Sequence, residues 1–143
     1  MHIPTTLLAQ VDASIGGKTG VNSKKFKNMI GAFKQPKAVL IDTYFLKSLS
    51  KKYIAAGYSE IIKHALIEDK NLLSKLDIFD QDFEKKENIA KLSDLIRMSS
   101  KIKANIVERD EKEKSIRAYL NFGHTFAHAI ESVQSFKGLN HGE

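Results

Sequence analysis

The feature that most constrains the fold of this chain of 143 residues is the spacing of its apolar residues after about residue 44. Apolar side chains recur there at the intervals that place them on one face of a helix. One series comprises Ile61, Ile62, Leu66 and Ile67, and the next comprises Ile89, Leu92, Leu95, Ile96, Ile102 and Ile106. This part of the chain is therefore predicted to be α-helical, with Asp77 to Asp82 connecting two helices.

The first part of the chain has a mixed character. Its glycines cluster at Gly16, Gly17, Gly20 and Gly31, which predicts turns. Ala38 to Asp42 then form a short apolar run after a proline, and such a run is typical of a buried strand. We expect this run to continue a sheet.

Composition narrows the classes of function. Lys and Arg number 23 against 17 Asp and Glu, and the formal net charge of +6 favours anionic partners. A basic helical module that binds nucleic acid is one hypothesis, but the only arginines are Arg97, Arg109 and Arg117, and base recognition usually recruits arginine. A lysine-rich solvated surface is the favoured interpretation, so we expect no nucleic-acid partner.

The sequence contains no cysteine, so a disulfide framework and a thiolate metal site are both excluded, and a transition metal must be bound by histidines and carboxylates. The first residues lack a basic region followed by a sustained apolar stretch, and about 18 consecutive apolar residues occur nowhere. We expect a soluble, cytoplasmic protein without a membrane partner.

The last predicted helix carries two kinds of stripe. An apolar stripe of Phe122, Phe126, Ala129, Ile130 and Val133 is predicted to be buried. A neighbouring polar stripe comprises Asn121, His124 and His128, and Arg117 extends it by one turn if the helix begins that early.

Several histidines have metal-ligand spacing. His124 and His128 stand at i and i+4, as in zinc helices of metalloproteases, but the glutamate of that motif is missing. Glu60 and His64 form a second such pair, and His141 follows near the end of the sequence. Spacing leaves two ligand sets open: a closed site of both pairs, or an open site of Glu60, His124 and His141 with positions for water or substrate.

The glycine-rich loop from Gly16 to Gly20 contains Gly-Lys-Thr but does not fit a phosphate-binding P-loop, because Asp12 holds the place of the first glycine. What remains is a turn that presents backbone N–H groups and Lys18, which is compatible with an anion cradle or with a plain surface turn.

Taken in order, these segments resemble the 3-dehydroquinate synthase family. The segment Ile3 to Ser14 is similar to the family's Pro-Thr-Thr-Leu-Leu-Ala-Gln-Val-Asp stretch and continues into Gly-Gly-Lys-Thr-Gly. Further matches follow over the rest of the chain: Lys27 to Phe33, Gln35-Pro36, Glu60 to Lys63, Arg117, Asn121 to Thr125, His128 to Glu131, and His141 to Glu143. Each match is short, and their number and order make the resemblance specific.

The resemblance implies a role for individual residues. Glu60, His124 and His141 match the family's zinc ligands, which selects the open site and leaves His64 in a structural or supporting role. The residues that match the pocket for the substrate's carboxylate, hydroxyls and phosphate are Asp12, Lys18, Asn28, Lys63, Lys103, Glu113, Arg117, Asn121 and His128. Those that match part of the NAD contacts are Thr5, Thr6, Lys18, Lys27, Phe45, Leu46, Lys47 and Ser48.

The implied fold is an α/β parent fold of which this chain is mostly α. Residues 1–50 are expected to be the end of a Rossmann-like NAD-binding domain, and residues 51–143 an α-helical domain that binds zinc and substrate. We expect a central fragment, truncated in both domains and with little activity alone, of a parent that the resemblance implies to be a homodimer.

The implied reaction converts the sugar phosphate 3-deoxy-D-arabino-heptulosonate 7-phosphate to 3-dehydroquinate and phosphate, a step of the shikimate pathway of aromatic amino acid biosynthesis. NAD is regenerated in each turnover, and zinc, or cobalt in its place, acts as a Lewis acid on the substrate hydroxyl. The alternative is another sugar-phosphate cyclase with the same cofactors, such as one that makes 2-deoxy-scyllo-inosose or a valiolone.

Overall fold

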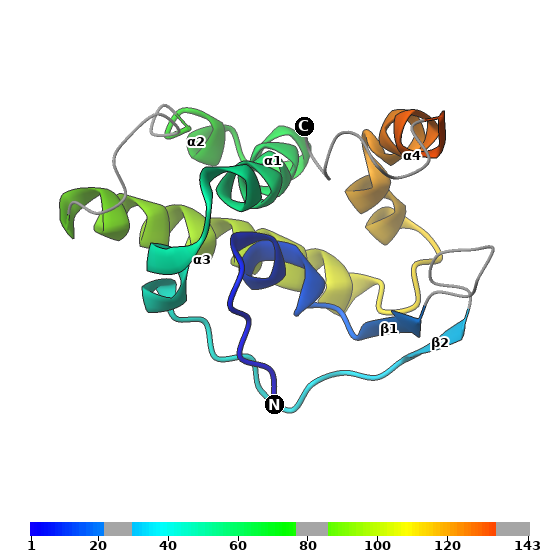
Figure 1. Cartoon of the computed structure of the whole chain (residues 1–143). Coiled ribbons are helices and arrows are strands. Elements are labelled where there is room, and N and C mark those ends of the chain that lie inside the picture. Colours follow the sequence, from blue (N-terminus) through cyan, green and yellow to red (C-terminus); the bar gives the residue numbers. More distant parts are fainter. Residues whose placement is uncertain (22–29, 77–85, 134–143) are drawn as a thin grey trace.

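In the computed structural model, which describes residues 1–21, 30–76 and 86–133, long helices dominate the second part of the chain. Helix α1 spans Lys51–Glu68, α2 is a short helix at Lys70–Leu73, α3 spans Lys86–Arg109 and α4 spans His124–Val133. Figure 1 shows α3 crossing the width of the molecule, with α1 and α2 above it. The prediction of a helical second part is confirmed for these residues, and the predicted connection at 77–82 lies outside them.

Short elements complete the fold. They are a π-helical turn η1 (Ala9–Ala13), the strands β1 (Lys18–Val21) and β2 (Ile30–Phe33), and the 3₁₀ helices η2 (Thr43–Ser48) and η3 (Ile116–Asn121). The prediction that this chain is mostly α is confirmed for the described residues.

The core lies where α1 packs on α3. Ile54, Tyr58, Ile61 and Ala65 form the buried face of α1, at the helical spacing of i, i+4, i+7 and i+11. From α3, the predicted residues Leu92, Leu95, Ile96, Ile102 and Ile106 are all buried. In the first predicted series, Ile61 is fully buried but Ile62 and Leu66 are exposed, because α1 packs against its neighbours with one side only.

The first helical segment packs between α1 and α3 and brings Asp12 to their junction. Leu7 and Val11 of this segment are completely buried. A Cβ atom at Gly57 of α1 would lie 2.5 Å from the backbone nitrogen of Leu8, so α1 can approach this closely only because it has no side chain there. The contact of η1 with both helices fixes the start of the chain on the helical core.

An antiparallel hairpin follows, in which Lys18 is opposite Phe33 and Val21 is opposite Ile30. The turn before it is built on Gly16 and Gly17, with φ of 107° and 68°, a backbone conformation that favours glycine. The predicted turn in this glycine-rich loop is therefore confirmed at Gly16 and Gly17, but it is wrong for Lys18 to Gly20, which belong to β1.

The predicted buried strand at Ala38 to Asp42 is wrong. Only Val39 pairs, in an isolated parallel bridge with His2, and Leu40 is 57% exposed. The bridge contains the hydrogen bonds from His2 N to Ala38 O and from Leu40 N to His2 O. An apolar run needs neighbouring strands on both sides to become a buried strand, and among the described residues only the segment around His2 pairs with this one.

The predicted apolar stripe of the last helix is also wrong for the residues whose side chains are described. Phe122, Phe126 and Ile130 are 63%, 79% and 46% exposed. Gly123 has φ of 82°, which ends the 3₁₀ helix η3 before α4 begins at His124. Because of this break, Arg117 and His124 do not share a continuous helix.

Candidate functional site

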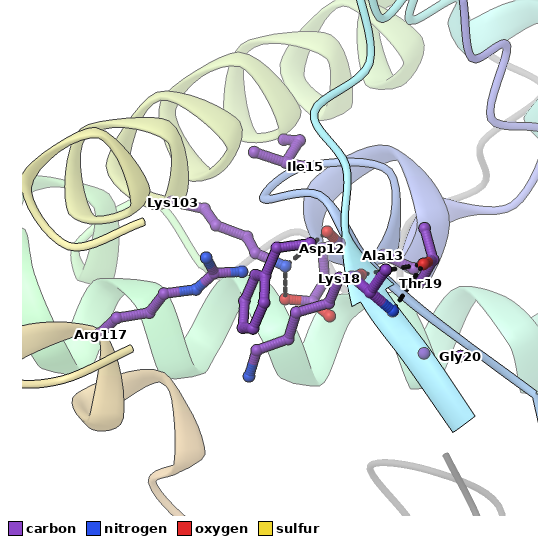
Figure 2. Close-up of a pocket in the computed structure, with 11 residues that line it drawn as sticks. Asp12, Ala13, Ile15, Lys18, Thr19, Gly20, Lys103 and Arg117 are labelled. Atoms are coloured by element: carbon purple, nitrogen blue, oxygen red, sulfur yellow. Dashed lines mark hydrogen bonds and ion pairs between the residues drawn. The ribbon is translucent and has the colours of Figure 1, made fainter. Parts of the chain in front are cut away.

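A cavity of about 600 Å³ lies between η1, the hairpin, the second half of α3 and η3. Figure 2 shows the side chains of Asp12, Lys18, Lys103 and Arg117 gathered at this cavity from four different segments. All four were assigned to the substrate pocket by resemblance. The full lining consists of Asp12, Ala13, Ile15, Lys18, Thr19, Gly20, Gly31, Ala32, Phe33, Lys103 and Arg117.

Lys103 joins α3 to η1 at one wall of the cavity. Its Nζ lies 2.5 Å from Oδ1 of Asp12 and also donates to the backbone carbonyl of that residue. Lys103 is buried, and desolvation lowers its pKa while the carboxylate of Asp12 opposes that shift. These two contacts hold the ammonium group in place at the cavity, and its third N–H donor is left for a bound anion.

Arg117 also lines the cavity and is only 2% exposed. Its guanidinium donates to two backbone carbonyls, Gly16 O at 2.8 Å and Glu111 O, and its Cζ lies 5.8 Å from the centre of the Phe33 ring. Within the described part of the chain, no carboxylate forms an ion pair with it. A buried charge without a counterion is costly, so this guanidinium is suited to bind an anion in the cavity.

Lys18 and Glu113 form an ion pair at the cavity mouth, and Asn121 donates to the same carboxylate at 3.0 Å. Desolvation raises the pKa of Glu113, but the hydrogen bonds from Lys18 and Asn121 outweigh it and hold the pKa below its ordinary value. The backbone of Glu113 has φ of 56°, in the left-handed region that a non-glycine residue occupies at a cost of about 1–3 kcal/mol. Three predicted residues thus meet here.

A second charged cluster lies on the buried face of α1 and shares Asp12 with the cavity. Glu60 forms an ion pair with Lys63, and both side chains are buried. The candidate ligand atoms of Asp12, Glu60 and His64 all lie within 4.8 Å of one another. The structure therefore places Glu60 beside Asp12 and His64, whereas the resemblance implied His124 and His141 as the other metal ligands.

His64 is completely buried in this cluster. Its Nδ1 lies 2.8 Å from Oγ of Ser99, and its Nε2 has no hydrogen-bond partner among the described residues. Burial lowers the pKa of His64 from 6.5 to about 4, with Asp12 and Glu60 opposing the shift and Lys63 and Lys103 adding to it. The imidazole is therefore neutral near pH 7.

The remaining predicted site residues are only partly described. His124 is half-buried at the start of α4, and the segment 121–126 lines a groove together with Leu66 and Ile67 of α1. Lys27 and Asn28, like His141, lie outside the described residues, and so does the side chain of His128. The convergence of Glu60, His124 and His141 accordingly stays a prediction.

Six of the predicted NAD contacts lie on two segments that a single buried side chain connects, while Lys18 lies on β1 and Lys27 lies outside the described residues. Nε2 of Gln10 donates to Pro4 O at 3.3 Å and to Asp42 O at 2.8 Å. Pro4 directly precedes Thr5 and Thr6, and Asp42 caps η2, the helix that contains Phe45, Leu46, Lys47 and Ser48. Gln10 therefore brings these segments near one another.

Three residues with a part in the site were not predicted: Gln10, Phe33 and Asp110. The first two occur in the segments that carry the resemblance, but their contacts join residues that are far apart in the sequence. Asp110 follows α3 in a stretch rich in charged residues, where nothing in the sequence distinguishes it from its exposed neighbours. No spacing rule would have identified these residues.

No helix in the described part of the chain combines the length and the apolar character needed to cross a membrane.

Two protein-family models together match the whole chain. The family model for the N-terminal part of 3-dehydroquinate synthase matches residues 1–56, and the model for its C-terminal part matches residues 57–143. The chain is 54% identical to the 3-dehydroquinate synthase of Campylobacter concisus and 50% identical to that of Nitratiruptor, over 143 residues in each case. It spans 40% of the length of these relatives.

Solved structures with the same arrangement are sugar-phosphate cyclases. A 2-epi-5-epi-valiolone synthase from Streptomyces hygroscopicus, solved with NAD⁺ and Zn²⁺ bound, matches with a TM-score of 0.84 at 30% identity. The match covers 98% of this chain and 39% of that one. A 2-deoxy-scyllo-inosose synthase, solved with carbaglucose-6-phosphate, NAD⁺ and Co²⁺, matches with a TM-score of 0.79 at 28% identity and covers 99% of this chain and 39% of that one.

Proposed function

This chain belongs to the 3-dehydroquinate synthase family, and we propose on that premise that it is the central part of an enzyme that converts 3-deoxy-D-arabino-heptulosonate 7-phosphate to 3-dehydroquinate and phosphate. In the parent protein, residues 1–50 are proposed to be the end of the NAD-binding domain and residues 51–143 part of the metal- and substrate-binding domain. We also propose that this parent is a cytoplasmic homodimer, which size-exclusion chromatography and cell fractionation test.

The observation that carries the proposal is the buried guanidinium of Arg117, which faces the cavity beside Lys103. The cavity and its mouth hold three cationic side chains, Lys18, Lys103 and Arg117, against the two carboxylates of Asp12 and Glu113. The excess of positive charge suits a substrate that carries a phosphate and a carboxylate. Cations that are fixed in place and buried also stabilise the negative charge that develops on a leaving phosphate.

The side chains of the cavity have distinct tasks in this proposal. Arg117 binds the phosphate through N–H groups that its two backbone acceptors leave unused, since a guanidinium has five donors. Lys103 donates a hydrogen bond to the same phosphate while it keeps its ion pair with Asp12. Asp12 orients a substrate hydroxyl as a hydrogen-bond acceptor, and Lys63, Asn28, Asn121 and His128 complete the pocket in the complete enzyme.

A metal ion fits the donor chemistry of this chain. Cysteine is absent, so the ligands are carboxylates and imidazoles, and the buried carboxylate of Glu60 is suited to be one of them. We propose Glu60, His124 and His141 as the ligands of zinc, which when bound supplies Lewis acidity to a substrate hydroxyl. The cluster of Asp12, Glu60 and His64 is the weaker candidate, because Lys103 already neutralises Asp12, a carboxylate that the favoured set does not use.

NAD is proposed to contact Thr5, Thr6, Lys18, Lys27 and the segment from Phe45 to Ser48, and when bound it supplies a reversible hydride acceptor. The support is the buried link through Gln10 between the segments that carry Pro4 and Asp42. Thr6 helps to fix the first segment, because its Oγ1 accepts a hydrogen bond from Ala9 N at 3.2 Å.

Phosphate release by the full-length protein from each candidate sugar phosphate tests the reaction. We expect release from the heptulosonate, dependent on NAD and zinc, and none from the substrates of the valiolone and deoxy-inosose synthases. Release from one of those substrates alone would transfer the assignment to the alternative cyclase. The 143-residue chain by itself is expected to show no turnover.

The ligand set is tested by metal content. Substitution of His124 by Ala in the full-length protein is expected to abolish stoichiometric zinc after dialysis, whereas His64→Ala retains it. The opposite pattern would assign the ion to Asp12, Glu60 and His64.

A further inference from the structure

Asp110 lies directly after the last residue of α3 and is buried. Its Oδ1 accepts a hydrogen bond from Lys114 N at 2.8 Å, and its Oδ2 accepts from Ser115 N at 2.7 Å and Arg117 N at 3.1 Å. The hydroxyl of Ser115 adds a fourth, longer contact at 3.4 Å. One carboxylate therefore binds three backbone N–H groups of the turn that follows the helix.

These hydrogen bonds hold the carboxylate in its charged form. The backbone N–H of Lys114 makes the largest contribution to a pKa of Asp110 below its ordinary value, and Ser115 and Arg117 act in the same direction against desolvation. Asp110 forms no ion pair within the described part of the chain. Its negative charge is therefore stabilised by the N–H groups of the turn.

The same turn determines where Arg117 lies. Asp110 holds the backbone nitrogen of Arg117, and the carbonyl of Glu111, within the same turn, is one of the two acceptors of the guanidinium. The other acceptor, Gly16 O, belongs to the turn that precedes β1. Because Arg117 pairs with no carboxylate among the described residues, the position of its charge depends on these backbone atoms.

We propose that Asp110 is a positioning residue that fixes the buried guanidinium of Arg117 at the cavity and so sets its affinity for the phosphate of the substrate. The proposal rests on the proposed function for the identity of the anion. Asp110 does not line the cavity, and it acts only through Arg117 and the turn between them.

The competing explanation is that Asp110 only stabilises the end of α3. Both explanations predict a lower melting temperature for Asp110→Ala, so stability does not distinguish them. They differ in the exposure of the Arg117 guanidinium in protein that is still folded, and in whether Asp110 matters once Arg117 has been removed.

The first experiment measures the reactivity of Arg117 with phenylglyoxal in the full-length protein, by peptide mapping, without any ligand. Arg97 and Arg109 serve as internal standards, since they carry exposed side chains. Arg117 is expected to be protected in the wild type and to react about tenfold faster in Asp110→Ala, at a temperature where both are folded. Glu108→Ala removes an exposed carboxylate of the same helix and is expected to leave the protection unchanged.

The second experiment is a double-mutant cycle on the affinity for inorganic phosphate, measured by calorimetry with the full-length protein. Asp110→Ala is expected to weaken phosphate binding about tenfold when Arg117 is present and by less than about twofold in the Arg117→Ala background. Asp110→Asn keeps one acceptor oxygen and is expected to be intermediate. It replaces Asp110→Ala in both experiments if the alanine variant does not fold.

Continued protection of Arg117 in folded Asp110 variants, or an equal effect of Asp110→Ala in both backgrounds, overturns the proposal. If the wild type releases no phosphate from the heptulosonate while Arg117 still loses its protection in Asp110→Ala, the proposed function fails and the positioning role stands.

Discussion

The walls of the cavity bury charged side chains, whereas the surface of η3 and α4 exposes large apolar ones. Around the cavity, the charged residues Arg117 and Lys103 are buried and held by hydrogen bonds. On η3 and α4, the large apolar residues Tyr119, Phe122 and Phe126 are exposed by more than 60% each. The difference shows that the contacts available to a side chain, and not its polarity, decide its burial here.

The two regions also differ in how they are connected to the rest of the chain. Hydrogen bonds of the cavity join residues about 100 positions apart, such as Arg117 to Gly16 at a separation of 101. Among the described residues, the groove beside α4 is lined by the end of α1 and by residues of the segment 118–126. Substitutions at the cavity are therefore expected to have large and specific effects, and those on α4 small ones.

The largest effect is expected for Lys103→Met, which keeps the length of the side chain and removes its charge. Asp12 then loses its ion-pair partner, and the phosphate loses a donor. In the full-length protein, kcat/KM is expected to fall by about 10²–10³. Lys101→Met changes an exposed lysine of the same helix and is the matched control; equal losses for the two variants would refute the role of Lys103.

A smaller effect is expected from the titration of His64. Its pKa is lowered by burial to about 4, so the unfolded chain binds more protons than the folded one between about pH 4 and 6.5. Stability is therefore expected to be complete above pH 6.5 and to fall by about 2–3 kcal/mol as the pH drops to 4.

Urea unfolding of metal-free protein across this range measures the effect. His64→Gln removes the titrating group, and its pH profile is expected to be flatter by the same amount. A wild-type profile no steeper than that of the glutamine variant would count against a buried neutral imidazole.

The third effect concerns Gly16, where a Cβ atom would lie 2.5 Å from Nη2 of Arg117 and where φ is 107°. Gly16→Ala is expected to displace the guanidinium and to weaken phosphate binding about tenfold, with some loss of stability from the backbone strain. Gly123→Ala is the matched control, since φ there is 82° but nothing lies within 4 Å of the new Cβ atom. If both variants weaken phosphate equally, strain and not the contact with Arg117 is responsible.

The smallest effect is expected for Phe126→Ser in the 143-residue chain. The side chain is 79% exposed, so the free energy of unfolding is expected to change by less than about 0.5 kcal/mol. Urea unfolding measures this, with Leu95→Ser in the core as the contrast. A loss above about 2 kcal/mol from Phe126→Ser would show that this surface is packed and would remove the contrast between the two regions.

Several parts of the site could be predicted from the sequence. The helical period identified the buried residues of α3, because that helix packs along one continuous face. The resemblance to the family nominated Asp12, Lys18, Lys103 and Arg117, and the structure brings these residues to one cavity. The metal ligands stay predictions, because His141 lies outside the described residues.

Other parts could not be predicted, for reasons that are local and physical. The apolar run at Ala38 to Asp42 has strand character, but whether it is buried depends on neighbouring strands that its own sequence does not specify. The periodicity of the last helix ignored Gly123, whose positive φ separates η3 from α4. Asp110 had no recognisable spacing, since its partners are backbone N–H groups and any sequence supplies those.

The sequence by itself therefore determined the family, the helical character of the second part and the residue types available for an anion and a metal, because these follow from local patterns and from the order of short motifs. Only the tertiary structure decided that Arg117 is buried with no carboxylate partner among the residues that the structure describes, that Gln10 connects two distant segments, and that His64 lies beside Asp12 and Glu60. Each of these facts depends on contacts between distant residues, and packing alone brings those residues together.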